Sequence, residues 1–178
     1  MSKRFPNPRL AYLQTQVAFG IPEFPVFHMR GGSSTGIVIW QQHLPADAAL
    51  RDELIRILMG VPRQGNVINN RQTSGLGRGT PTSNKVFIVD ADPARRLLTS
   101  TLAQLAADKS TIDWSVNCGN MSAALPLYAM DTGLIHACGN RFDVEIFNTN
   151  TSSRMSAQMT LQDGSNHLEP IQNLFDNS

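Results

Sequence analysis

Short apolar runs with a period of two predict most of the strands. Phe142, Val144 and Ile146 alternate with Asp143 and Glu145, a pattern typical of a half-buried strand. Residues 25–30 and 36–42 are β-rich runs joined by the turn Gly-Gly-Ser-Ser-Thr-Gly, which predicts a hairpin or a strand-loop-strand. Further strands are predicted at 85–91, 111–116, 133–139, 142–150 and 154–164.

Helical periodicity predicts three helices. In residues 45–60 an Asp precedes apolar residues at helical spacing (Leu50, Leu54, Ile57, Leu58), and Gly60 ends the run. A second helix is expected over 92–109, with Pro93 in its first turn. The third begins near Gly119 and is apolar on most sides. Strands and helices are mixed along the chain, with neighbouring β-runs, which predicts an α+β domain whose sheet curls around this third helix.

Two segments are expected to lack regular structure. Residues 1–23 are rich in proline and are predicted to be extended and irregular, so one domain is assigned to 24–178. Residues 61–84 contain almost nothing that could build a core, and such long loops are usually functional or disordered. The tail at 165–178 is predicted to be weakly structured.

Composition excludes several classes of protein. The chain has 178 residues, 41% apolar and 16% charged, with a net charge of +1, so neither a nucleic-acid groove nor a polybasic membrane surface is expected. No secretory signal or transmembrane span is recognisable. Two cysteines make no disulfide framework and favour a reducing compartment, so a cytoplasmic protein is expected. The four histidines are scattered, and no metal site is predicted.

Two glycine-rich segments are candidates for ligand binding. The Gly75–Gly79 motif is not followed by a helix, so neither a Rossmann nor a Walker loop is predicted. Lys85 instead opens a strand after this segment. In Arg30–Gly36, consecutive backbone N–H groups, hydroxyls and a guanidinium are suited to cradle a carboxylate. A plain hairpin turn explains the same residues equally well.

Cys118 lies at the predicted start of the third helix, between Asn117 and Gly119. Free N–H groups at a helix start attract anions and favour a thiolate, and Gly119 allows a ligand to approach the backbone. Asn117 and Asn120 are suited to cap the helix or to bind a ligand. The alternative is a small cysteine that packs into the core. Cys138, within a predicted strand, is interpreted as a packing residue.

Four segments together resemble the PrpF family: HMRGGSSTG, GLGRGTPTSNK, DWSVNCGNMSAALPLYAMDTGLI and VEIFNTNTSSR. The resemblance runs from about Phe24 to Thr151, and it implies the diaminopimelate epimerase-like fold, with a curled, mostly antiparallel sheet around a central buried helix. It also implies an isomerase or tautomerase that shifts a C=C bond or proton in a small unsaturated di- or tricarboxylic acid without a cofactor. The matching catalytic residues are Lys85, the favoured base, and Cys118. The implied substrate-binding residues are Arg30, Gly31, Gly32, Ser33, Ser34, Ser83, Asn117, Gly119, Asn120 and Met121.

The chain departs from the family pattern at two points. Thr35 replaces a lysine of the family motif, which implies fewer or differently placed acids on the substrate. The second domain of the family is absent from the sequence, although the family's active site lies between two domains. Three interpretations stay open: a fragment of a full enzyme, a half that forms a homodimer or pairs with a partner half-chain, or an altered carboxylate-binding or accessory protein.

Overall fold

The computed structural model describes residues 16–18, 21–162 and 165–168. Within the segment predicted to be irregular, β1 (Gln16–Ala18) and β2 (Ile21–Glu23) pair antiparallel, and residues 1–15 and 19–20 lie outside the described residues. In chain order there follow β3 (Phe27–Gly31), β4 (Ser34–Trp40), the 3₁₀ helix η2 (Gln41–His43), α1 (Ala48–Met59), β5 (Lys85–Asp92), β6 (Leu97–Leu105), β7 (Ile112–Asp113), α2 (Gly119–Ser122), α3 (Leu125–Asp131), β8 (Arg141–Asn148), β9 (Ser153–Gln162) and β10 (Ser165–Leu168).

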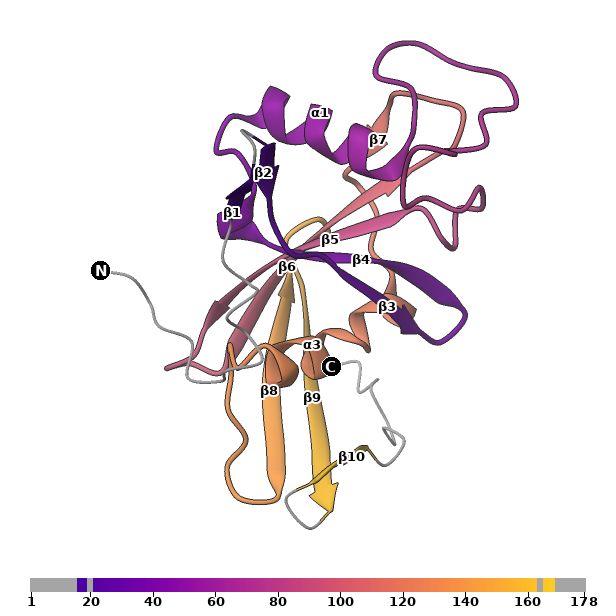
Figure 1. Cartoon of the computed structure of the whole chain (residues 1–178). Helices are drawn as coiled ribbons and strands as arrows, with labels where there is room; N and C mark the ends of the chain where they lie inside the picture. Colours follow the sequence, from indigo (N-terminus) through magenta and orange to yellow (C-terminus); the bar gives the residue numbers. More distant parts are fainter. Residues whose placement is uncertain (1–15, 19–20, 163–164, 169–178) are drawn as a thin grey trace.

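One large sheet has the strand order β10-β9-β8-β6-β5-β4-β3, with β7 paired to β6. Its pairs are antiparallel except β4–β5 and β6–β8, which are parallel. In Figure 1, β8 and β9 run steeply across the direction of β4 and β5, and α3 lies where the sheet curls. The predicted α+β architecture, with a curled and mostly antiparallel sheet around a buried helix, is therefore confirmed.

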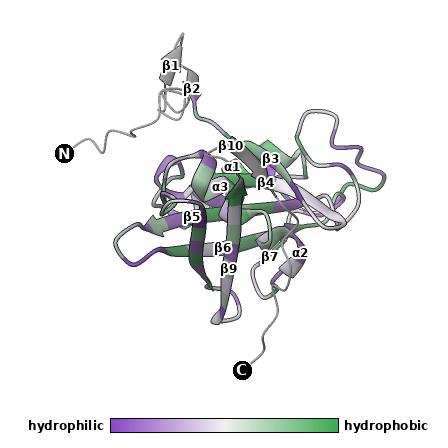
Figure 2. Ribbon diagram, turned by 90° about the horizontal axis from the view of Figure 1, so that it is seen from below, coloured by the Kyte–Doolittle hydropathy of each residue, from purple (hydrophilic) through white to green (hydrophobic). Residues whose placement is uncertain are grey.

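The central strands are buried on both faces because helices cover both. Ile37 and Ile39 of β4 pack with Ile55 and Met59 of α1, whereas Val38, between them in sequence, packs toward the other helices. The buried residues thus form two cores, one that includes α1 and one that includes α2 and α3. The core with α2 and α3 is the larger, and in it Met121, Leu125, Tyr128 and Ala129 are almost fully buried. Figure 2 shows the hydrophobic colour on α3 and along β6. Strands buried on both faces are expected to be continuously apolar, as Ile37–Trp40 of β4 and Val86–Val89 of β5 are.

The helix predicted over 92–109 is wrong, because these residues form a turn and strand β6. Leu98 and Leu102 are four residues apart, a spacing that places side chains on one face of a helix and equally on one face of a strand. The antiparallel ladder with β5, from Lys85↔Gln104 to Asp92↔Leu97, stabilises the strand. The turn before it contains Arg96 with φ = 51°.

Three smaller predictions need correction. Residues 133–139 form no strand, since only Cys138 makes an isolated bridge, to Arg141. The helix expected from Gly119 is divided into α2 and α3, and Pro126 lies in the first turn of α3, where its missing N–H costs nothing. α1 is confirmed, with Asp47 as its N-cap, but its buried side chains are Ile55 and Met59, whereas Leu50 and Ile57 are exposed.

Candidate active site

The tip of the β3–β4 hairpin contacts the start of α2. Gly32, the first of the two turn residues, has φ = 54°, a conformation that glycine adopts without strain. A Cβ on Gly31 would lie 1.9 Å from the Asn120 carbonyl oxygen, so only glycine permits this approach. Asn120 Nδ2 donates a hydrogen bond to Ser33 Oγ over 3.1 Å. The hairpin that sequence reasoning left open as a plain turn is therefore one wall of the candidate site.

Cys118 is brought to the same hairpin. It is the N-cap residue of α2, and its Sγ lies 3.6 Å from Ser34 Oγ, within hydrogen-bond distance for sulfur. Asn117 braces it, because Asn117 Oδ1 accepts from Cys118 N at 2.7 Å. Ser34 is buried and Cys118 is half-buried, so the thiol is partly accessible from one side. Cys118 also packs against the larger hydrophobic core, so its packing role and its contact with the hairpin occur together.

The predicted binding residues Arg30, Ser83 and Met121 lie in three different surroundings. Arg30 is exposed, and its Nε donates back to Gly32 O at 3.1 Å, so its guanidinium lies beside the hairpin turn. Ser83 belongs to the turn before Lys85 and accepts a hydrogen bond from Thr80 Oγ1. Met121, also predicted to bind the substrate, is fully buried in the core and anchors α2 there.

Lys85 lies at the start of β5 with only 6% of its surface exposed. Its Nζ donates to Pro81 O at 2.6 Å and to Gln104 Oε1 at 2.5 Å. Burial lowers the pKa of Lys85 from its ordinary value of 10.5, and negative charge at Cys118 opposes this shift. Gly36 makes room on β4, because a Cβ there would lie 2.9 Å from Lys85 Cβ.

The lowered pKa of Lys85 is not explained by a helix dipole. A long helix beginning at Gly119 would have supplied a positive potential at its start. The observed α2 has only four residues, so its dipole is small. Burial of the ammonium group is the dominant cause instead.

Buried amides order the loop at 61–84, which lacks core-forming residues. Gln72 is 3% exposed, and its Nε2 donates to Met59 O and Asn84 Oδ1, while its Oε1 accepts from Gly79 N. Asn84 Oδ1 also accepts from Arg78 N at 3.0 Å. These contacts fix the chain immediately before Lys85. Sequence reasoning missed Gln72, Asn84 and Gln104. For Gln72 and Asn84, the available signal was the presence of amide side chains in a long loop with few apolar residues.

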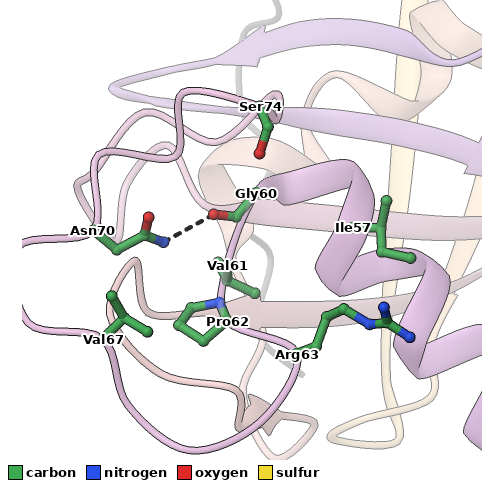
Figure 3. A pocket seen from close by; sticks show the side chains of 8 residues that line it. All are labelled: Ile57, Gly60, Val61, Pro62, Arg63, Val67, Asn70 and Ser74. Carbon is green, nitrogen blue, oxygen red and sulfur yellow. Dashed lines mark hydrogen bonds between the residues drawn. The ribbon is translucent and has the colours of Figure 1, made fainter.

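A separate hollow of about 330 Å³ lies between the end of α1 and this loop (Figure 3). It is lined by Ile57, Gly60, Val61, Pro62, Arg63, Val67, Asn70 and Ser74. Asn70 Nδ2 donates to Gly60 O at 2.9 Å, which ties the loop to the helix end. None of the predicted site residues lines this hollow. Its lining carries no acid or base other than Arg63, which pairs with Glu53.

Among residues 16–18, 21–162 and 165–168, no three His, Cys, Asp or Glu side chains lie close enough together to hold a metal ion. Over those ranges, no helix has the length and apolar character that crossing a membrane requires.

Comparison with known proteins shows the family to which this domain belongs. A family model described as PrpF protein matches residues 22–170. The chain belongs to the PrpF family. A 4-oxalomesaconate tautomerase from Pseudomonas putida is 34% identical over 146 residues, which cover 82% of this chain and 39% of that protein. A 3-methylitaconate isomerase from Eubacterium barkeri is also 34% identical, over 79% of this chain and 36% of its own length.

A solved PrpF-type structure confirms the fold. The crystal structure of a methylitaconate-delta-isomerase matches with a TM-score of 0.69 and 33% sequence identity, over 79% of this chain and 35% of that one. The chain thus spans well under half the length of the PrpF relatives it matches.

Proposed function

We propose that this chain provides the proton-transfer site of a cofactor-independent isomerase or tautomerase acting on a small unsaturated di- or tricarboxylic acid. The observation that carries the proposal is that Cys118 and Lys85 both lie against the start of β4, where Cys118 Sγ is 3.6 Å from Ser34 Oγ and Gly36 lies against Lys85. Burial lowers the pKa of Lys85 and so favours the neutral amine, the form that can accept a proton, more than at an exposed lysine. PrpF relatives named as isomerases and tautomerases of such acids give independent support.

The proposed reaction moves one proton and one double bond. Neutral Lys85 takes a proton from the allylic carbon, and the electron pair of that C–H bond forms the new C=C bond as charge spreads into the conjugated carboxylate. Cys118, as the thiol, gives its proton to the far end of the allylic system, so the substrate composition is unchanged. Proton exchange with solvent then returns Lys85 to the amine and Cys118 to the thiol. The Ser33 and Ser34 hydroxyls and the Asn120 amide are the side-chain donors at the hairpin suited to hold a carboxylate.

The second candidate function is a carboxylate-binding or accessory protein without turnover. It is favoured by Thr35, which stands where the family motif has a lysine. In either case, we propose that a second copy of the chain or a partner half-chain completes the site, since the family resemblance implies an active site between two domains.

Proton exchange in D₂O separates the two candidates. The protein is incubated with cis-aconitate, itaconate-type and oxalomesaconate-type acids, and loss of the allylic proton is followed by NMR. Exchange in the parent chain supports the isomerase, and we expect Lys85→Ala to slow it by about 10²–10⁴-fold while acid binding persists. Cys118→Ser should slow exchange less, because a hydroxyl keeps the hydrogen bond to Ser34. Binding without exchange favours the accessory protein.

A further inference from the structure

Gln104 is the direct cross-strand partner of Lys85. In the antiparallel β5–β6 ladder the two residues are in register, and Gln104 Oε1 accepts the Lys85 Nζ hydrogen bond. The other end of the amide is held as well, because Nε2 donates to Pro81 O and Asn84 O at 3.0 Å and to Leu105 O at 3.3 Å. An amide nitrogen only donates, so these carbonyls determine that the oxygen faces Lys85.

Lys85, Gln104 and Pro81 form a closed triangle of hydrogen bonds. Pro81 O accepts from both Lys85 Nζ and Gln104 Nε2, so the two acceptors of the lysine are fixed relative to one another. A neutral amine has two N–H groups and one lone pair in tetrahedral arrangement. When both N–H groups point to fixed carbonyl oxygens, the lone pair has one remaining direction. In the ammonium form, the third N–H takes that same direction.

We propose that Gln104 is a positioning residue that, together with Pro81 O, aims the Lys85 lone pair, so that this lysine takes up and releases its proton along one direction. The inference rests on the proposed role of Lys85 as the base. It assigns to the amide a function that a carboxylate at the same position could not serve. A neutral acceptor orients the amine, whereas a negative one would also hold the proton on it.

The charged groups around this pair are few. Cys118 acts on Lys85 from the start of α2, where its negative charge raises the pKa of Lys85 against the effect of burial. On the far side of Gln104, Asp113 of β7 is its cross-strand neighbour. Hydrogen bonds from Ser115 lower the pKa of Asp113, which is exposed to solvent. A new carboxylate at position 104 would therefore act on Lys85 more directly than either of these groups.

Titration of Lys85 tests the proposal without requiring activity. The chain has three lysines, Lys3, Lys85 and Lys109, so protein labelled with ¹³C-lysine gives three sets of Cε signals. Lys85→Arg assigns the signal of interest. We expect Gln104→Glu to move the Lys85 midpoint to higher pH, because a carboxylate stabilises the ammonium form. Gln104→Leu should move it to lower pH, because the buried ammonium loses an acceptor. Gln64→Glu, the same change at an exposed loop position, should leave it unmoved.

The outcomes separate positioning from plain structural support. A Lys85 midpoint that is the same in the parent, Gln104→Glu and Gln104→Leu would overturn the proposal. If Gln104→Leu does not fold, Gln104→Met replaces it, and folding is checked from the amide spectrum. In a parent that exchanges substrate protons, Gln104→Leu should slow exchange by about 10- to 100-fold, with a pH profile that follows the Lys85 midpoint. A parent that exchanges no proton contradicts the proposed function and leaves the titration result standing.

Discussion

At the scale of single residues, Lys85 is the least expected group in the domain interior. Lysine is rarely buried, because moving an ammonium group out of water is unfavourable unless hydrogen bonds compensate. Here two oxygen acceptors bind the Lys85 ammonium group. They do not fully offset the loss of its hydration, so the pKa of Lys85 is still lowered. A residue that weakens folding while it is charged, yet is held by specific acceptors, is typical of a functional site.

The buried lysine predicts a specific dependence of stability on pH. The folded-state pKa of Lys85 is lower than the unfolded-state value near 10.5, so between these values the unfolded chain binds more protons. The free energy of unfolding of the parent, relative to Lys85→Met, should be constant below the folded-state pKa and should rise with pH up to about 10.5. Urea denaturation of both proteins across this range measures the difference, and a difference that does not change with pH would contradict the lowered pKa.

Gly31 is the second residue for which the structure predicts a specific effect of substitution. Alanine there would place its Cβ 1.9 Å from the Asn120 carbonyl oxygen, which belongs to the backbone and has little freedom to move. We expect Gly31→Ala to lower the free energy of unfolding by about 1–3 kcal/mol and to displace Asn120 from Ser33. Gly65→Asn is the matched control, since Gly65 has open space around it and asparagine tolerates its positive φ. Equal stability of Gly31→Ala and the parent would show that the hairpin can move away from α2.

At the scale of elements, β6 is the strand that the sequence alone predicted wrongly, as a helix. Most strands could be predicted because their apolar runs are too short for a helix or alternate with a period of two. These are β3, β4, β5, β8 and β9. In β6 the leucines suit either period, and only the ladder with β5 decides between them. The helix prediction also hid Gln104, whose relation to Lys85 exists only when the two strands pair. Lys85, Cys118 and the hairpin could be found because family motifs marked them.

The segment leading to Cys118 is held by one side chain that follows β8. Asn150 Oδ1 accepts from Leu102 N at 2.7 Å, and its Nδ2 donates to Leu102 O and Trp114 O. It thereby joins β6 to the segment between β7 and α2. Asn150→Ala should lower the free energy of unfolding by about 1–3 kcal/mol, because buried backbone groups lose their partners. Hydrogen exchange at residues 114–118 should become faster. Asn140→Ala, at an exposed turn, is the control, and equal exchange in both variants would exclude this role.

At the scale of the whole molecule, the fold is that of one PrpF-type domain, although the relatives it matches are more than twice as long. Its exposed large apolar side chains are concentrated on one part of the surface. In the described ranges with side chains, 23–161, these are Leu50 and Ile57 of α1 and Val67, Ile68 and Leu76 of the adjacent loop. Ile57 and Val67 line the hollow in Figure 3. Exposed apolar patches of this kind mark association surfaces more often than isolated apolar residues do.

We therefore expect the protein to associate through the α1 end and the loop at 61–84, either with a second copy or with a partner half-chain. Ile68, with 86% of its surface exposed, has the most apolar area to gain from burial. Sedimentation of the purified chain should show a species larger than the monomer that Ile57→Gln combined with Ile68→Gln converts to monomer. Gln158→Ala, on the exposed face of β9, should leave the assembly unchanged. If the parent is monomeric, the same pair of substitutions should abolish recovery of a partner chain from cells. A monomeric parent from which no partner is recovered would show that this apolar surface remains uncovered, and the proposed completion of the site by another chain would fail with it.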